Sequence, residues 1–351
     1  MRRKRTQIAN PDLINSLHVT QRCARQNFLL DDNCGPCGKF ERRRNAILDR
    51  ITHLAGTFAV EILGVALMNN HLHLILRNRP DIVSQWSDLE VARRWLCICP
   101  GFSQAHADFF KRKPDLPTLE DAANLAKDGE KIKLLRRRLA DIGSFMWSLN
   151  DYTAKLFNLT DCMTGCFWEG RYKAQSLLDN LALLLCVLYV DLNPIRAGMA
   201  ITPEESEFTS AYLQIQSTKA MNECPSISPS LLPNAFLSPI QISADPSAQL
   251  CSRTGRRASD YGFLDMTAAE YLIILDLMGR LMRSDKTAKI PNDLPPIFER
   301  LNITFENAQE LVRGYRQLFT SFVGTKASIH AKAQEFGLKR VHCAAITRKM
   351  I

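Results

Sequence analysis

The chain has 351 residues, of which 46% are hydrophobic and 23% are charged, a balance typical of folded soluble proteins rather than disordered or fibrous ones. Forty-five Lys and Arg residues against 36 Asp and Glu residues leave a net charge of +9, which favours a polyanionic partner such as nucleic acid. Eleven scattered cysteines, an odd number, favour free thiols in a reducing compartment over a disulfide framework.

The amino-terminal residues, MRRKRTQIAN, are basic and lack the apolar core of a signal peptide. The longest apolar run, 181–190, is too short to span a bilayer. We therefore expect a cytoplasmic protein with no membrane partner. The basic arm at 1–5 is as compatible with a phosphate contact as with a solvated terminus.

Apolar stretches separated by turn residues predict the elements of the first hundred residues. In chain order they are strand 17–23, helix 39–54, strand 59–68, strand 71–76 and helix 82–96. Asn69 and Asn70 separate the last two strands and suit a tight hairpin, because Asn tolerates a positive φ. A later strand near 172–178 could complete a βαββαβ sheet of the ferredoxin-like type, which the sequence alone leaves open.

His71 and His73 lie two residues apart in a predicted strand, so both project from one face while Leu72 points to the core. Two imidazoles at this spacing can share one divalent metal ion. A pair of histidines on a polar sheet face would give the same short pattern. His18, on the first strand, is expected on the sheet face in a packing or DNA-contact role.

Two other stretches carry weaker signals. Cys34-Gly35-Pro36-Cys37 matches a redox motif, but a polar stretch precedes it, and free cysteines in a turn explain it better than redox or zinc chemistry. The insertion at 97–140 interleaves aromatic and basic residues, which suits single-stranded DNA but equally suits a solvated helix face over a small core.

The apolar segment 181–190 predicts a helix that Asp179 or Asn180 caps and that Pro194 ends. Tyr189 and Asn193 are four residues apart and therefore share one helix face. If that face meets the two histidines, Asn193 can supply a third, oxygen ligand, and the Tyr189 hydroxyl stands close to the metal.

The remainder of the chain divides into two parts. Residues 216–260 are rich in Ser and Pro and are expected to form a linker. Residues 261–351 predict a carboxy-terminal all-α domain, in which Thr267 and Glu270 form a capping box. This domain could grip duplex DNA or bind another protein.

Several motifs together resemble the single-tyrosine HUH transposases, in particular the subgroup associated with repetitive extragenic palindromes in bacteria. The resemblance covers about residues 14 to 215, and the order of the motifs is more specific than any one of them. The motifs are HVTQR at 18–22, HLH at 71–73, FWEGRY at 167–172, YVDLNPIRAGM at 189–199 and FTSAY at 208–212.

The resemblance implies an α+β fold, a ferredoxin-like βαββαβ sandwich with an antiparallel sheet and the histidines on its open face. Residues 1–215 would be the catalytic domain, with a helical insertion at about 97–160. The implied nucleophile is Tyr189, and the implied ligands of Mg²⁺ or Mn²⁺ are His71, His73 and Asn193. The expected DNA contacts are Arg22, Arg171, Lys173 and Arg196, for which capping or salt bridges are the alternative.

By the same resemblance, the protein cuts and rejoins single-stranded or hairpin DNA through a 5′-phosphotyrosine intermediate without ATP. Tyr152 is a rival nucleophile, but Leu156 stands four residues after it instead of a ligand. Two other classes stay open: an inactive sequence-specific DNA-binding protein, and a metal hydrolase that pairs the histidines with Glu61 or Asp191. The sequence is compatible with a homodimer or a monomer.

Overall fold

The computed structural model describes residues 10–30, 39–98, 117–281, 322–323 and 325–335. The basic arm at 1–5, the Cys34–Cys37 pair and large parts of the insertion (99–116) and of the carboxy-terminal region (282–321, 336–351) lie outside these ranges. Helices and a mainly antiparallel sheet make up the described part of the chain, which confirms the α+β class.

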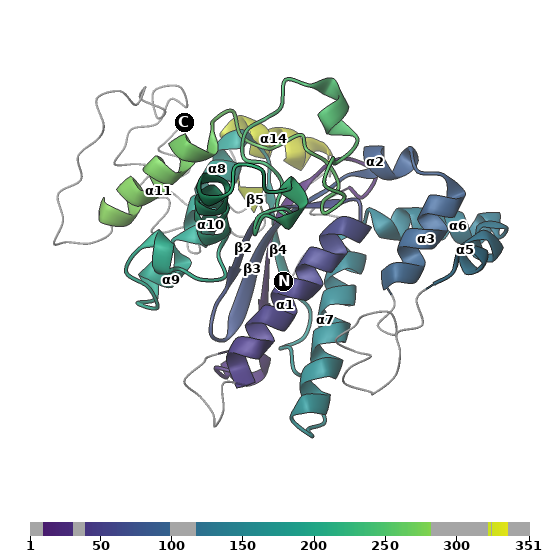
Figure 1. The fold of residues 1–351 in the computed structure, drawn as a ribbon, viewed down its shortest axis with the longest axis horizontal. Coiled ribbons are helices and arrows are strands. Elements are labelled where there is room, and N and C mark those ends of the chain that lie inside the picture. The colour runs from purple at the N-terminus through teal and green to yellow at the C-terminus, as the bar shows by residue number, and fades with distance from the viewer. Residues whose placement is uncertain (1–9, 31–38, 99–116, 282–321, 324, 336–351) are drawn as a thin grey trace.

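The sheet has the strand order β2-β3-β1-β4-β5 (Figure 1). The strands are β1 (Ser16–Arg22), β2 (Val60–Leu67), β3 (His71–Asn78), β4 (Lys173–Leu177) and β5 (Phe322–Val323). All pairs among the first four are antiparallel, and β5 adds two residues parallel to β4. The four strands expected from the sequence are confirmed, each to within three residues at either end.

The hairpin between β2 and β3 is closed by a hydrogen bond from Met68 N–H to His71 O. Among the described residues, the positive-φ positions do not include Asn69 or Asn70, so the expected left-handed turn is wrong. Their carbonyl groups instead accept hydrogen bonds from Leu30 and Cys23, which fixes the hairpin against the segment after β1.

Helices fill most of the remaining described chain. They are α1 (Lys39–Thr57), α2 (Pro80–Ser84), α3 (Asp88–Ile98), α5 (Leu119–Ala126), α6 (Gly129–Leu139), α7 (Ile142–Thr160), α8 (Asn180–Asp191), α9 (Asn193–Arg196), α10 (Ser210–Glu223), α11 (Ala268–Leu281) and α14 (Lys326–Glu335). The single helix expected at 82–96 is two helices, because the Ser87 hydroxyl accepts from Glu90 N–H and caps a new start. No helix within the described ranges is long and apolar enough to cross a membrane.

One face of the sheet is covered by α1 and α7. Leu72 and Leu74 of β3 are fully buried there, together with the α1 stripe that includes Ile47 and Ile51. Burying a side chain of this size contributes about 1.5–3 kcal/mol, so this layer is a main source of stability. The expected orientation of Leu72 toward a core is confirmed.

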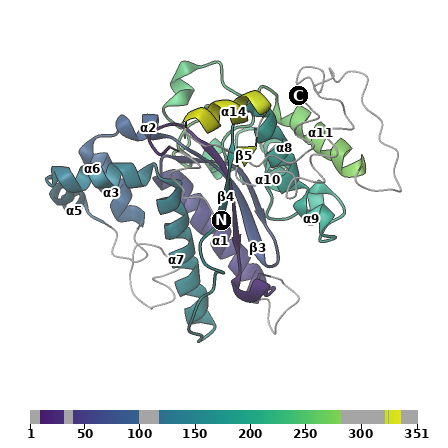
Figure 2. The same ribbon diagram turned by 180° about the vertical axis from the view of Figure 1, so that it is seen from behind.

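The opposite face is covered by α8, with α10 and α11 beside it (Figures 1 and 2). Helix α8 is buried around its circumference, which explains why its sequence is apolar on all sides. Ile75 of β3, Leu188 of α8 and Ile274 of α11 belong to one apolar cluster. The face that carries the two histidines is therefore packed under the helix that carries Tyr189.

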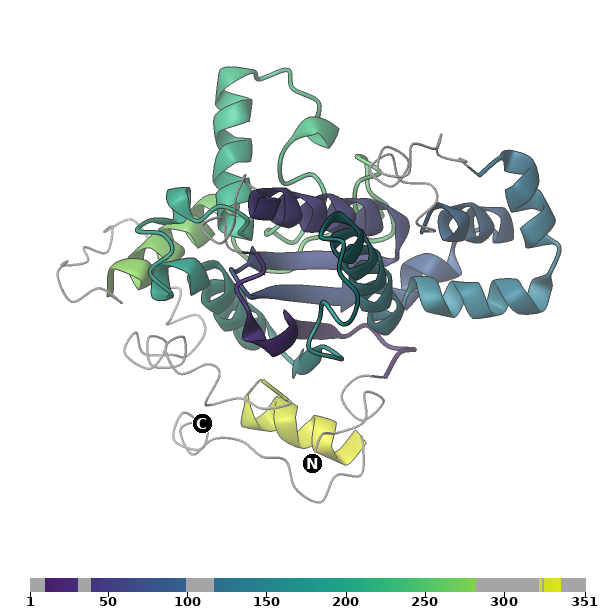
Figure 3. The same cartoon turned by 90° about the horizontal axis from the view of Figure 1, so that it is seen from below.

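Residues of the expected linker at 216–260 also pack against the sheet. Phe236 and Leu237 are buried, and Ser238 N–H donates to the carbonyl of Ile62 on the outer strand β2. Beyond the other edge, α14 lies next to the β4 and β5 side of the sheet (Figure 3). Segments from the last third of the chain thus contact both edges.

Candidate active site

A row of polar side chains crosses the sheet beneath α8, because cross-strand partners in antiparallel strands project from the same face. The pairs in this row are Arg22–His71, Thr20–His73, Thr20–Lys173 and His18–Gln175. Two of the expected DNA contacts, Arg22 and Lys173, therefore share a face with the expected metal ligands. The strand register alone assembles this row from three parts of the chain.

His73 is fully buried and is held by β1. Its Nδ1 lies 2.8 Å from Nε2 of His18 and 3.3 Å from Oγ1 of Thr20. The other ring nitrogen of His18, Nδ1, lies 2.9 Å from Oε1 of Gln175 on β4. A chain of contacts thus runs from β4 through β1 to the buried histidine of β3.

His71 lies at the mouth of the hairpin and is half-buried. Its Nδ1 is 2.6 Å from Oδ1 of Asn70, the residue that precedes it. The ring centres of His71 and His73 are 4.9 Å apart, and the ring planes cross at 76°. The two imidazoles are therefore neighbours on one face, as the His-x-His spacing predicts.

Tyr189 is 2% exposed and packs against the histidines. Its ring centre lies 5.8 Å from that of His73 and 6.0 Å from that of His18, edge-on in both cases. Asp179 caps the start of α8 by accepting a hydrogen bond from Ala182 N–H, as expected, and so fixes where the helix begins. The structure therefore brings Tyr189 together with His73 of the His-x-His pair and with His18.

The predicted helix ends before Pro194, at Asp191, but the expected reason is wrong, because Asn193, the residue before the proline, is itself helical and begins α9. Leu192 keeps a right-handed helical backbone, and Arg196 N–H donates to Leu192 O across α9. Proline is tolerated in the first turn of a helix, where its missing N–H has no partner to lose. As a result, the Arg196 guanidinium lies 5.0 Å from the centre of the Tyr189 ring.

Asn193 starts α9 one helical turn beyond Tyr189. Its Nδ2 is buried and has no hydrogen-bond partner within the described part of the chain. A half-turn of the amide would point Oδ1 in that direction, and such an oxygen is a suitable ligand for Mg²⁺ or Mn²⁺. Among the described residues, no group of three or more His, Cys, Asp or Glu side chains could hold a metal ion. The proposed ligands, the imidazoles of His71 and His73 and the amide oxygen of Asn193, are instead a set of two nitrogens and one oxygen, which suits a divalent ion such as Mn²⁺.

Arg171 lies on the FWEGRY motif, which anchors the end of β1. Trp168 donates from Nε1 to Thr153 Oγ1 of α7, and Glu169 N–H donates to Arg22 O. Trp168 is buried in these contacts, whereas Arg171 is exposed. The motif therefore holds the strand end that carries Arg22 and leaves Arg171 at the surface.

Tyr152 lies in a different part of the molecule. It belongs to α7 and is buried in the core layer on the other face of the sheet. The Arg50 guanidinium covers its ring at 4.5 Å from the ring centre. The sheet separates this tyrosine from His71 and His73.

The two carboxylates of the alternative hydrolase hypothesis are engaged in buried networks. Glu61 accepts from Arg79 Nη1 at 2.6 Å and also contacts Arg77 and Ser259. Asp191 accepts from Tyr271 Oη at 2.6 Å. Since Asp191 follows Tyr189 by two residues, it projects from the opposite side of α8.

Asp191 ties α8 to α10 and α11. Besides the Tyr271 hydroxyl, it accepts hydrogen bonds from Ser210 Oγ at 2.9 Å and from Ala211 N–H at 3.2 Å. Burial raises the pKa of Asp191 to about 6, and burial beside this carboxyl raises the pKa of Tyr271 well above its usual value. This clamp was not anticipated from the sequence, although a polar residue within an all-apolar helix is a signal for one.

Replacing Tyr271 with phenylalanine should lower the free energy of unfolding by about 1–3 kcal/mol, because a buried carboxyl loses its hydroxyl donor. Denaturant unfolding of the full chain measures this change. Tyr261→Phe is the matched control, because Tyr261 lies in a less buried position under Arg77 and should stay within about 0.5 kcal/mol of the native chain. Equal stability of the Tyr271 variant and the native chain would contradict the clamp.

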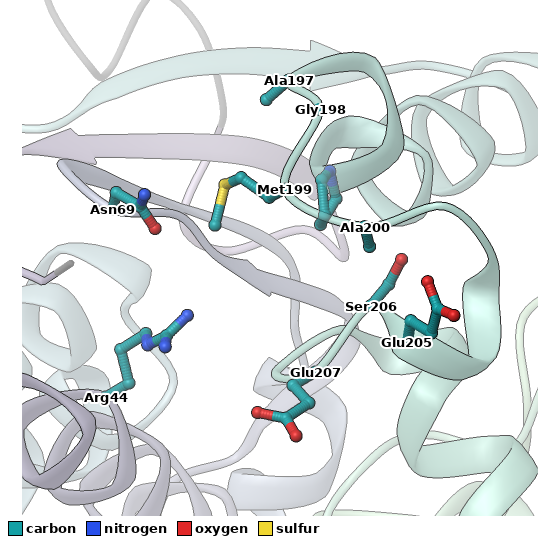
Figure 4. A pocket seen from close by; sticks show the side chains of 10 residues that line it. Arg44, Asn69, Ala197, Gly198, Met199, Ala200, Glu205, Ser206 and Glu207 are labelled. Carbon is teal, nitrogen blue, oxygen red and sulfur yellow. The ribbon is translucent and has the colours of Figure 1, made fainter. Parts of the chain in front are cut away.

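A cavity of about 470 Å³ opens beside the end of the tyrosine helix. Figure 4 shows Arg44 and Asn69 on one side of it and Met199, Glu205 and Glu207 on the other. Pro194 also lines it, so the cavity adjoins the turn that carries Asn193. Its volume is large enough to admit a small ligand beside this turn.

No protein-family model matches this chain, and no curated protein and no solved structure matches it at a significant level. Function is therefore inferred from the geometry of the site and from the motifs. The residues of the site to which the sequence assigned no role are Thr20, Gln175 and Tyr271, and Asn70 was expected only as a turn residue and not as a partner of His71. The alternation of His18, Thr20 and Arg22 with apolar or inward residues was the available signal for the first strand.

Proposed function

We propose that this protein is a single-tyrosine transposase of the HUH type that cuts and rejoins single-stranded DNA through a covalent link to Tyr189. The observation that carries the proposal is the contact of Tyr189 with His73 and His18, which lie far away in the sequence. A phenol packed edge-on against imidazoles and covered by a guanidinium is an arrangement suited to a nucleophile at phosphorus.

The fold proposed for this function is the ferredoxin-like βαββαβ sandwich. The strand order β2-β3-β1-β4 with antiparallel pairing supports it, as does the cover of one face by α1 and α7. In this proposal α5 and α6 belong to the insertion at 97–140. Together with α3 they lie at one end of the molecule, whereas α8, α9 and α11 lie at the other (Figure 1).

The residues that would hold the metal ion are His71, His73 and Asn193. When bound, Mg²⁺ or Mn²⁺ would polarise the scissile phosphate and offset the charge that develops on it. The site's own residues supply the rest: β3 aligns the two imidazoles, and the α8–α9 path places Asn193 one turn from the nucleophile.

In the proposed reaction, the Tyr189 oxygen attacks the scissile phosphorus, and the bond from phosphorus to the 3′ oxygen breaks. The phenol gives up its proton, and the leaving oxygen takes one to become a 3′-OH. The 5′ phosphate stays esterified to Tyr189 until the 3′-OH of another strand attacks it and restores the phenol. The Arg196 guanidinium lies 5.0 Å from the centre of the Tyr189 ring, so its positive charge would offset negative charge that develops beside the phenol during the attack. The phosphodiester bond energy is conserved, so no ATP is required.

The exposed basic residues around the row would bind the DNA backbone. Lys173 and Arg196 are exposed, and Arg22 lies directly opposite His71. The preferred partner is single-stranded or hairpin DNA in the cytoplasm, where phosphate contacts supply affinity and not base specificity.

Lys173→Ala should weaken binding of a single-stranded oligonucleotide and reduce the slope of log K against log salt by about 0.7, because one phosphate contact is lost. Fluorescence anisotropy over a salt series measures both. Lys155→Ala is the matched control, since Lys155 is exposed on α7 and paired with Asp151. An unchanged slope for Lys173→Ala would remove this residue from the DNA path.

The decisive test of the proposed function is a covalent adduct. Labelled hairpin oligonucleotides incubated with the full chain and Mn²⁺ should give a band on denaturing gels shifted by the mass of the protein. If the oligonucleotides bind but none of them forms an adduct with either Mg²⁺ or Mn²⁺, the result would instead support an inactive DNA-binding protein.

A further inference from the structure

We propose that Gln175 and His18 are positioning residues that fix the tautomer of His73, so that its Nε2 carries the lone pair that faces the site. Asn70 fixes His71 in the same way. That these lone pairs bind a metal ion rests on the proposed function. The assignment of the tautomers does not depend on that function.

The His18–His73 contact has the geometry of an imidazole–imidazole hydrogen bond. His18 Nε2 and His73 Nδ1 are 2.8 Å apart, and the centres of the two rings are 5.1 Å apart. The difference between these distances equals the sum of the two ring radii, so both nitrogens lie close to the line that joins the ring centres. The ring planes differ by only 15°. The rings are therefore nearly coplanar and meet edge to edge, which is the alignment that an N–H···N bond requires.

The direction of this bond depends on the orientation of the Gln175 amide. In the structure its Oε1 faces His18 Nδ1 at 2.9 Å, and an amide oxygen only accepts, so in this orientation Nδ1 of His18 carries the hydrogen. In a neutral imidazole the other nitrogen, Nε2, then has a lone pair and accepts from His73 Nδ1–H. With its hydrogen on Nδ1, neutral His73 presents a lone pair at Nε2.

His71 reaches the same state by a shorter route. Its Nδ1 lies 2.6 Å from the Asn70 amide oxygen, which again can only accept. Both histidines of β3 therefore carry hydrogen on Nδ1 and present Nε2, with ring centres 4.9 Å apart on one sheet face. Residues that fix a ligand's tautomer in this way typically change metal affinity about 10- to 100-fold when they are replaced.

The test uses three variants of the full chain. Gln175→Met keeps the length of the side chain but removes the acceptor, whereas Gln175→Glu keeps oxygen acceptors. Gln21→Met is the matched control, because Gln21 lies on the adjacent strand β1 and points to the opposite face, where it donates to Gly170 O. Unfolding curves establish that each variant is folded before it is compared.

The first readout is the tautomer of each histidine in the metal-free protein, from long-range ¹H–¹⁵N spectra of chain labelled at histidine. We expect the native chain, Gln175→Glu and Gln21→Met to show His18 and His73 with hydrogen on Nδ1. Gln175→Met should show redistribution at both histidines and none at His71. A native His73 with its hydrogen on Nε2 would overturn the proposal.

The second readout is Mn²⁺ affinity, measured by titration with detection of free Mn²⁺ by electron paramagnetic resonance. Gln175→Met should bind about 10- to 100-fold more weakly than the native chain, and Gln175→Glu should recover most of this loss. Affinity of Gln175→Met equal to the native value would overturn the positioning role. If both readouts follow Gln175 but Tyr189 forms no DNA adduct, the transposase proposal fails and the tautomer inference stands.

Discussion

Tyr189→Phe should abolish both the covalent protein–DNA adduct and strand cleavage. The substitution removes only the phenolic oxygen and keeps the ring that packs against His73 and His18, so the fold should be retained. Any partner of the hydroxyl left unpaired would cost at most about 1–3 kcal/mol. The measurement is a denaturing gel with labelled oligonucleotide, combined with thermal unfolding to confirm that the variant is folded.

Tyr152→Phe is the internal control for this result. Tyr152 lies under Arg50 on the far face of the sheet, so its hydroxyl cannot serve a site built on His71 and His73. This variant should form adduct at the native rate. Adduct from Tyr189→Phe that disappears in Tyr152→Phe would transfer the nucleophile to α7 and remove Asn193 from the ligand set.

His71→Ala and His73→Ala should each lower the cleavage rate at least about a hundredfold, because metal assistance is worth several kcal/mol at the transition state. Oligonucleotide affinity should stay within a few-fold of the native value, because phosphate contacts come from dispersed Arg and Lys residues. Single-turnover cleavage in Mn²⁺ and anisotropy binding measure the two quantities separately.

His53→Ala provides the comparison for a histidine outside the site, since His53 is exposed on α1 and contacts Cys97 O. It should cleave at the native rate. Removal of divalent metal by a chelator should reproduce the effect of the two site variants on the native chain. Full cleavage by the double variant His71→Ala, His73→Ala in chelator would end the metal hypothesis.

Local signals in the sequence were sufficient for much of the scaffold. Apolar stretches bounded by turn residues marked the strands, the Asp179 cap marked the start of the tyrosine helix, and the Thr267–Glu270 capping box appears as expected. Each of these features depends on residues that lie close together in the chain, so it can be predicted from the sequence. The rule that spacing sets the face also placed His71 and His73 side by side.

Contacts between segments that are distant in the chain could not be predicted from the sequence. Whether His18 meets His73 depends on the register of β1 against β3, and a shift of one residue would have sent it to the other face. The hydrogen bond between Tyr271 and Asp191 joins residues 80 positions apart, and the sequence around either residue does not indicate its partner. The helical state at Pro194 was misjudged because a local steric rule was applied where α9 begins a new first turn.

The two edges of the sheet are partly closed by distant segments. On the β2 side, Leu237 bridges Ile62 and Thr209 bridges Ala66, and on the β4 side β5 pairs with the last two residues of the strand. Open edge strands offer unpaired amide groups to other chains, and native proteins often guard them with lysine. Among the residues that the structure describes, β5 leaves the first part of β4 uncovered. This part begins with the exposed Lys173, whose charge opposes pairing of this edge with the same edge of another copy.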